Sequence, residues 1–133
     1  MAHILPYPLP DRDTCTLDEW KQYKMELIDD KSSELISNQG FLYNGKTFSL
    51  RKTSQLNILG VERRKELQGL LPVTFNTIDN MDTEALATPG QVDSFFDAAL
   101  AAKKSILDSG TALKDQIRAA ADKDAVDAIE DNR

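Results

Sequence analysis

The sequence predicts an α+β fold that is mainly helical, with an N-terminal extended arm, three or four helices including one long C-terminal helix, and a small antiparallel β-hairpin with a possible third strand. Three observations lead to this prediction: alternate prolines near the start, an Asn-Gly pair between two β-prone runs, and a seven-residue repeat of apolar and small residues in the last third. We expect an arm over residues 1–15 and a single elongated domain over residues 16–133.

Composition narrows the classes of protein before any motif is considered. The 133 residues are 41% hydrophobic and 29% charged, slightly less apolar and more charged than an average soluble domain, which argues against both a disordered and a membrane-bound chain. No apolar run approaches the roughly 18 residues that a bilayer span needs. The opening residues lack the basic flank and apolar core of a signal peptide, so we expect the protein to be intracellular at synthesis. Residues 79–133 hold twelve Asp+Glu against six Lys+Arg, which argues against nucleic acid as a partner.

The arm is predicted from Pro6, Pro8 and Pro10. Each proline lacks a backbone donor and disfavours helix in the residue before it, so residues 1–15 read as extended or polyproline-like. A frayed terminus is the alternative. The apolar residues that alternate with the prolines favour an arm that packs on a neighbour; these are Ile4, Leu5, Tyr7 and Leu9.

The first helix and the hairpin follow from local signals. Thr16 and Glu19 form a capping box, which predicts a helix over residues 17–37. Asn44 and Gly45 suit a two-residue turn that needs positive φ at both positions, which predicts a hairpin over residues 41–50 with strands at 41–43 and 46–50. Because an isolated hairpin is marginal, we expect it to pair with a third strand or to lie on a helix, and residues 73–78 are the available third strand.

A second helix is predicted over about residues 54–71. Leucines recur at near-helical spacing from Leu56, Thr53 or Ser54 is the expected cap, and Pro72 ends the pattern. Gly60 leaves open whether this is one helix or two.

The long helix, over about residues 89–121, is predicted from Thr88, Pro89 and Gln91, which form a capping box with proline at the first helical position. Positions 92, 99, 106, 113 and 120 form the apolar repeat. Three arrangements stay open: packing on the first helix within one chain, a self-associating bundle, or a break at Gly110.

A short closing helix is expected over about residues 123–130. Asp122 is its predicted cap, and its apolar residues Val126 and Ile129 are expected to fold back on Leu113 or Ile117.

Candidate chemistry is sparse in this sequence. The single histidine, His3, lies among prolines and is a poor general base, and with the single Cys15 it cannot build a zinc site. The acidic run over residues 79–84 fails the calcium-loop pattern at Met81 and Glu84. We therefore expect no catalytic residues, no metal and no cofactor.

The order of features resembles a known family. The hairpin "GFLYNGKTFSL", the Ser-Gln-x-Asn element at Ser54 to Asn57, "LPVTFNT", the capped long helix and "LKDQIRAAADKDAVDAI" resemble an uncharacterised domain of tailed bacteriophages, found in tail-fibre, tail-tip and tail-fibre-assembly proteins. The likeness covers about residues 36–130. "LDEWKQYKMEL" is similar to the Trp-x-x-Tyr-Lys/Arg helix of tail-fibre assembly proteins.

The resemblance implies a non-enzymatic virion structural or adaptor protein of the tail, tail tip or fibre attachment region. Its implied partners are other phage tail or fibre proteins and further copies of itself, and its implied location is the virion after synthesis in the host cytoplasm. The alternative is a tail-fibre assembly chaperone that is absent from the mature virion. The residues expected at interfaces are Ile4, Leu5, Tyr7, Leu9, Val92, Phe95, Phe96, Ile106, Leu113 and Ile117.

Overall fold

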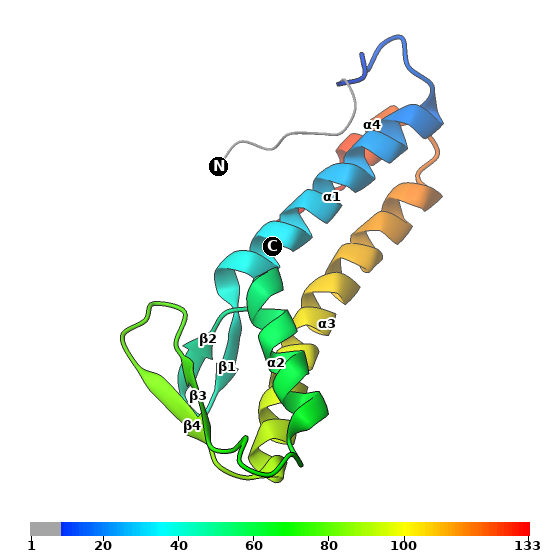
Figure 1. Cartoon of the computed structure of the whole chain (residues 1–133). Coiled ribbons are helices and arrows are strands. Elements are labelled where there is room, and N and C mark those ends of the chain that lie inside the picture. The colour runs from blue at the N-terminus through cyan, green and yellow to red at the C-terminus, as the bar shows by residue number, and fades with distance from the viewer. Residues whose placement is uncertain (1–8) are drawn as a thin grey trace. The chain divides into compact units, whose positions relative to one another are not determined.

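The computed structural model describes residues 9–133, which form four helices and two separate two-stranded sheets (Figure 1). The helices are α1 (Leu17–Gln39), α2 (Lys52–Arg64), α3 (Pro89–Ala119) and α4 (Lys123–Asp127). The strands are β1 (Phe41–Tyr43), β2 (Lys46–Phe48), β3 (Val73–Asn76) and β4 (Thr83–Leu86). The predicted α+β, mainly helical fold with a long C-terminal helix is confirmed. Most of the predicted arm, residues 1–8, lies outside the described residues.

The chain divides into two compact units. The terminal unit consists of residues up to Ser33 together with Leu107–Arg133, and the central unit consists of Glu34–Ile106. Helices α1 and α3 each run through both units, so each helix contributes one part to either core. The expected single elongated domain over residues 16–133 stays a prediction.

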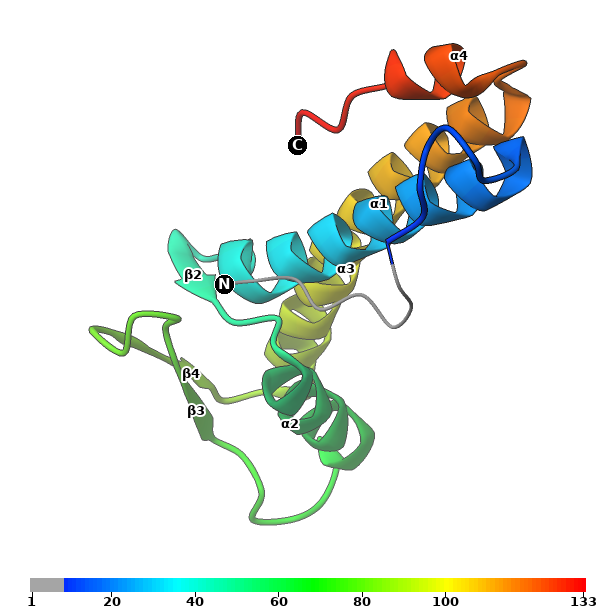
Figure 2. The same ribbon diagram turned by 90° about the horizontal axis from the view of Figure 1, so that it is seen from above.

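The terminal unit is held together by a small core under α4, which lies beside the start of α1 and the end of α3 (Figure 2). Its buried residues are Trp20, Ile28, Ile117 and Val126. Leu113 and Ile129 pack against them, as the sequence predicted for the closing helix. The predicted cap is also present, because Asp122 Oδ1 accepts a hydrogen bond of 2.7 Å from the Ala125 amide.

Gly110 is a close-packing position and not a helix break. Helix α3 continues through it, so the predicted option of two helices is wrong. A Cβ atom at Gly110 would lie 2.8 Å from Ser32 Oγ and 3.1 Å from Arg133 Nη1. Glycine therefore lets α1 and α3 approach closely here, which offsets its poor helix propensity.

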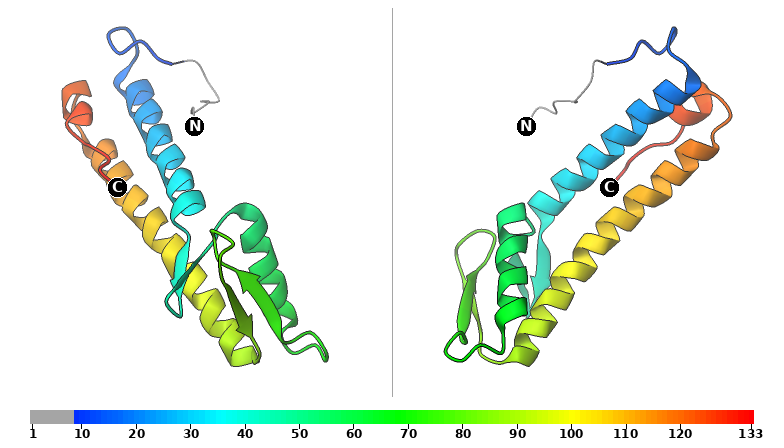
Figure 3. Two further views of the ribbon diagram at one scale, coloured as in Figure 1. Left: turned by 90° about the vertical axis from the view of Figure 1, so that its left-hand side faces the viewer. Right: turned by 45° about the vertical axis from the view of Figure 1, so that its right-hand side comes forward.

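The central unit is built around Phe95. Figure 3 shows α2 and both strand pairs grouped around the N-terminal half of α3, which carries this ring. Four aromatic rings lie within 5.1 Å of Phe95, centroid to centroid; they belong to Phe41, Tyr43, Phe48 and Phe75. Edge-on and stacked ring pairs of this kind add to the free energy of apolar burial, so the side chain that meets all four is the main contact of this core.

The hairpin forms as predicted, but the third strand pairs elsewhere. Asn44 and Gly45 have φ of 52° and 77°, as a type I′ turn requires. Strand β3 pairs with β4, with Val73 opposite Leu86, and not with the hairpin. One hydrogen bond of 2.9 Å, from the Ile78 amide to the Thr47 carbonyl, joins the chain beyond β3 to β2. The predicted pairing was wrong because a strand missing from the prediction, β4, satisfies the β3 backbone.

The second helix is shorter than expected. Helix α2 begins at Lys52 and ends at Arg64, and its N-cap is Arg51 with no side-chain capping bond, so Thr53 and Ser54 lie inside the helix. It passes through Gly60 as one helix. Residues 65–70 form turns and a bend, with positive φ at Gly69, before β3 begins at Val73. The other helix ends agree with the prediction to within three residues.

Candidate functional site

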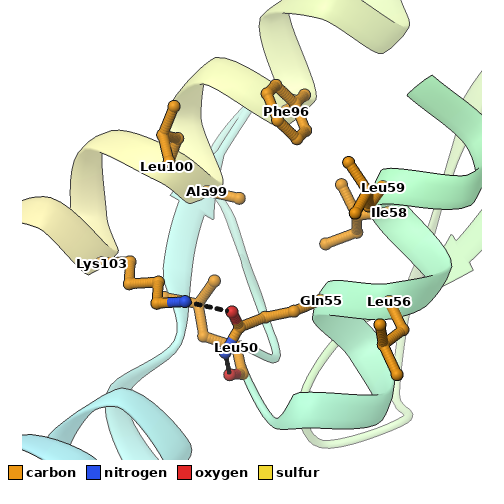
Figure 4. A pocket seen from close by; sticks show the side chains of 9 residues that line it. All are labelled: Leu50, Gln55, Leu56, Ile58, Leu59, Phe96, Ala99, Leu100 and Lys103. Carbon is orange, nitrogen blue, oxygen red and sulfur yellow. Dashed lines mark hydrogen bonds between the residues drawn. The ribbon is translucent and has the colours of Figure 1, made fainter. Parts of the chain in front are cut away.

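The candidate site is an apolar groove between α2 and α3 of the central unit, with a volume of about 240 Å³ (Figure 4). Seven of its nine lining residues are apolar. They come from both helices and from a position two residues before α2, and are Leu50, Leu56, Ile58, Leu59, Phe96, Ala99 and Leu100. The remaining two, Gln55 and Lys103, lie together at one end of the groove.

Two of the leucines that line the groove are more than half exposed. Leu56 on α2 is 60% exposed and Leu100 on α3 is 53% exposed, and both line the same groove. Single exposed leucines are ordinary on protein surfaces, but two that line one apolar hollow form a surface whose burial is favourable. Covering it removes apolar area from water at about 25 cal/mol per Å².

The polar end is fixed by a short chain of hydrogen bonds. Lys103 Nζ donates to Gln55 Oε1 over 2.7 Å, and Gln55 Nε2 donates to the Leu50 carbonyl over 2.6 Å (Figure 4). Within residues 9–133 the half-buried Lys103 has no carboxylate partner. An ammonium group has three donors, so two remain for a bound group. The groove therefore offers apolar contact along its length and hydrogen-bond donors at one end.

The predicted interface residues fall into three groups. Ile4, Leu5 and Tyr7 lie outside the described residues, whereas Leu9 is described and is 67% exposed. Phe96 lines the groove. The other five pack in or against the cores of the two units: Val92, Phe95 and Ile106 in the central unit, and Leu113 and Ile117 in the terminal unit. The interface itself stays a prediction.

Sequence reasoning did not select Leu56 or Leu100 as site residues. Leu56 was counted only as part of a helical pattern, and Leu100 lies outside the seven-residue repeat. The missing signal was the position of α2, since a pattern on one helix does not tell which of its apolar residues a second helix will cover.

A second hollow in the central unit is polar. It has a volume of about 550 Å³ and lies between the start of α2 and β3. Side chains of Arg51, Asn57 and Asn76 line it, together with several Ser and Thr residues. Water can form hydrogen bonds with these exposed polar groups, so the polar hollow is an ordinary feature of a protein surface. The apolar groove is therefore the stronger candidate for a binding site.

The root of the arm is anchored on the terminal unit. Arg12 donates from Nε to Asp127 Oδ2 over 2.7 Å and from Nη2 to Asp124 Oδ1 over 2.6 Å. Lys123 Nζ donates to the Arg12 carbonyl over 2.6 Å and also to the Cys15 carbonyl. The chain that precedes Arg12 therefore starts from a fixed point on α4.

Asp127 is the electrostatic centre of this anchor. Partial burial raises the pKa of its carboxyl, but hydrogen bonds from Trp20 and Arg12 and the nearby charges of Arg12 and Lys24 outweigh burial and hold the pKa below its usual value. The bond from Trp20 Nε1 to Asp127 Oδ1 is 2.9 Å long. The ionised carboxylate thus ties the arm root, α1 and α4 together.

Metal and covalent chemistry have little support among the residues that the structure describes. Between residues 9 and 133 the structure places no three His, Cys, Asp or Glu side chains where they could share a metal ion. Cys15 is a half-buried free thiol, and His3 lies outside the described residues. Asp79 accepts hydrogen bonds from Thr77 Oγ1 and the Met81 amide, which lower the pKa of Asp79 and form a local turn.

Comparison with known proteins gives a family. The model of the family described as "Domain of unknown function (DUF4376)" matches residues 19–130, and the chain belongs to this family. No curated protein and no solved structure matches the chain. None of the helices within residues 9–133 has the length and apolar character needed to span a bilayer.

Proposed function

We propose that the protein is a non-enzymatic structural or adaptor component of a bacteriophage virion, in the tail, tail tip or fibre attachment region. The observation that carries the adaptor role is the apolar groove between α2 and α3, because its exposed leucines favour a protein contact. The phage setting rests on the resemblance of the order of sequence features, from the hairpin to the closing helix, to the tail-protein domain.

The geometry favours binding over chemistry. The polar side chains in the groove, Gln55 and Lys103, bond to each other, and the remaining lining residues are apolar. Such a surface supplies shape and apolar area, which are the properties that hold neighbouring proteins together in an assembly. Partners of this surface are other tail or fibre proteins and further copies of the chain.

Mass spectrometry of purified, salt-washed particles tests the proposal. We expect the chain in a constant ratio to the tail proteins across preparations. Particles from phage that carry Leu56→Asp and Leu100→Asp should contain less of it, because a charge in an apolar contact is costly. The matched control is Leu67→Asp with Met81→Asp, which also replaces exposed apolar residues of the central unit, 56% and 83% exposed, outside the groove.

An assembly chaperone is the competing function, since a chaperone also needs an exposed apolar surface for its client. The same preparations separate the two. A chain that is abundant in infected cells but absent from washed particles would contradict the virion proposal and favour the chaperone.

A further inference from the structure

We infer that the groove between α2 and α3 binds the N-terminal arm, residues 1–10, of a second copy of this chain. The inference rests on the proposed function, because it names the contact by which copies would join in an assembly. Three observations lead to it: the hydrogen-bonding character of the groove, the amino-acid sequence of the arm, and the anchoring of residues 11–15 on the terminal unit.

The groove suits a ligand that needs few hydrogen bonds. It lies between two helices whose backbone groups bond within each helix, so it has no strand edge on which a peptide could add. Its remaining polar capacity is mainly on the donor side: Lys103 Nζ has two further N–H groups and Gln55 Nε2 has one, whereas the Gln55 oxygen already accepts one of its two possible hydrogen bonds. The complementary peptide is apolar, poor in N–H donors and rich in free carbonyl groups.

The arm has this composition. Pro6, Pro8 and Pro10 have no N–H. The polyproline-type conformation that the sequence predicts for this segment has no internal hydrogen bonds, so in that conformation its carbonyl groups can accept from a partner. Four apolar residues alternate with or flank the prolines: Ile4, Leu5, Tyr7 and Leu9. They can occupy the space between Leu56 and Leu100, while Lys103 donates to arm carbonyls. Leu9, the apolar arm residue that the structure describes, is 67% exposed.

The arm root makes such a contact possible between copies. Residues 11–15 are held on the terminal unit by the bonds of Arg12 and Lys123, so the arm begins at a fixed point. If the arm adopts the polyproline conformation that the sequence predicts, its ten residues would extend about 31 Å, at about 3.1 Å per residue. Because the arm and the groove are different segments of the chain, binding of one copy's arm in the next copy's groove is a head-to-tail contact, which generates a ring or a filament when it repeats.

Complementation between two defective variants tests the inference in sedimentation velocity. The first variant lacks residues 2–10 and keeps the groove. The second carries Leu56→Asp and Leu100→Asp and keeps the arm. We expect the wild-type chain to associate with rising concentration, each variant alone to stay monomeric, and an equimolar mixture of the two to form a one-to-one dimer. The Leu67→Asp, Met81→Asp control should associate like the wild type.

A labelled peptide of residues 1–11 gives a direct measurement. We expect it to bind the chain that lacks residues 2–10 and to lose at least tenfold in affinity when the groove leucines are replaced by aspartate. Circular dichroism should show unchanged helix content, because both leucines are more than half exposed.

Several outcomes would overturn the inference. A monomeric wild type whose arm-deleted form binds the peptide would place the arm in the groove of its own chain. Association that survives arm deletion, or a mixture that stays monomeric, would assign self-association to another surface. These results are independent of particle composition: a chain that associates as expected but is absent from virions contradicts the proposed function alone.

Discussion

At the scale of single residues, Gly110 decides how closely α1 and α3 approach in the terminal unit. Its missing side chain leaves room for Ser32 Oγ and Arg133 Nη1, which would lie 2.8 Å and 3.1 Å from an added Cβ. Arg133 in turn donates to the Ser32 hydroxyl and to the Ile28 carbonyl. A methyl group at position 110 therefore displaces a hydrogen-bonded contact and not merely a loose side chain.

We expect Gly110→Ala to lower the free energy of unfolding by about 1–3 kcal/mol, the usual cost of overpacking, although alanine favours helix. Gly60→Ala is the matched control, since nothing lies within 4 Å of a Cβ at that position in α2. This second change should raise stability by about 0.5–1 kcal/mol. Urea unfolding of both variants measures the difference, and a stabilised Gly110→Ala would show that the close approach is absent in solution.

The Asp127 carboxylate makes the terminal unit sensitive to acid. Its pKa in the folded chain lies below the value of about 3.9 for an unperturbed aspartate. A depressed pKa contributes stability above the unfolded value, and this contribution is lost as the pH falls through the folded pKa. The lowered pKa of Asp127 therefore predicts that the stability contributed by this anchor is lost as the pH falls below about 4.

We expect Asp127→Asn to lower the melting temperature at pH 7, because the amide loses the charge pair with Arg12 while it can still accept from Trp20. The gap between the variant and the wild type should narrow as the pH falls below about 4. Asp115→Asn, which removes an exposed pair with Arg118, should produce a smaller change. Melting curves monitored by tryptophan fluorescence measure this, and a gap independent of pH would contradict the assignment.

At the scale of elements, the α4 cap closes the terminal unit. Asp122 accepts from the Ala125 amide, and the next residue, Val126, is 1% exposed in the core. We expect Asp122→Ala to cost about 1 kcal/mol and Asp122→Asn much less, because asparagine is also a good cap. Equal losses for the two variants in urea unfolding would show that the charge of Asp122, and not its capping bond, stabilises the helix.

Caps and turns explain why most elements could be predicted from the sequence. Thr16 with Glu19, and Thr88 with Gln91, form both bonds of their capping boxes, and each box places a helix start correctly. These signals involve residues only three positions apart, so they can be recognised in the sequence without knowledge of the fold. Asn44 is a local signal of the same kind, and it places the hairpin turn correctly.

The pairing of β3 and the end of α2 could not be predicted from the sequence, because both depend on contacts between residues that are far apart in the chain. Strand β4 contains Glu84 and Ala85, which are poor β-formers, and it becomes a strand because β3 is available beside it. Helix α2 ends at Arg64, although the leucine pattern that predicted it continues along the sequence to Leu71. Lys65, the residue that follows, instead bonds to Glu62 and Asp93, a contact to α3 that no local pattern reveals.

At the scale of the whole molecule, the same limit applies to the candidate site. Phe96 was predicted as an interface residue and lines the groove, whereas Val92 and Phe95 of the same prediction are buried in the central core. The repeat identified the apolar side of α3 but not how α2 and the strands would cover it. The exposed leucines of the groove followed only from the packed structure.

Separate cores in the two units lead to a prediction about cooperativity. Phe95 meets four rings in the central unit, and the terminal core around Ile117 contains none of them. We expect Phe95→Ala to cost about 3–5 kcal/mol and to raise hydrogen exchange over residues 41–86, while residues 112–129 change little. Ile117→Ala, at about 2–5 kcal/mol, should give the reverse pattern. Exchange measured by mass spectrometry on both variants tests this. A uniform rise along the chain in either variant would show that α1 and α3, which run through both units, couple the two cores into one unfolding unit.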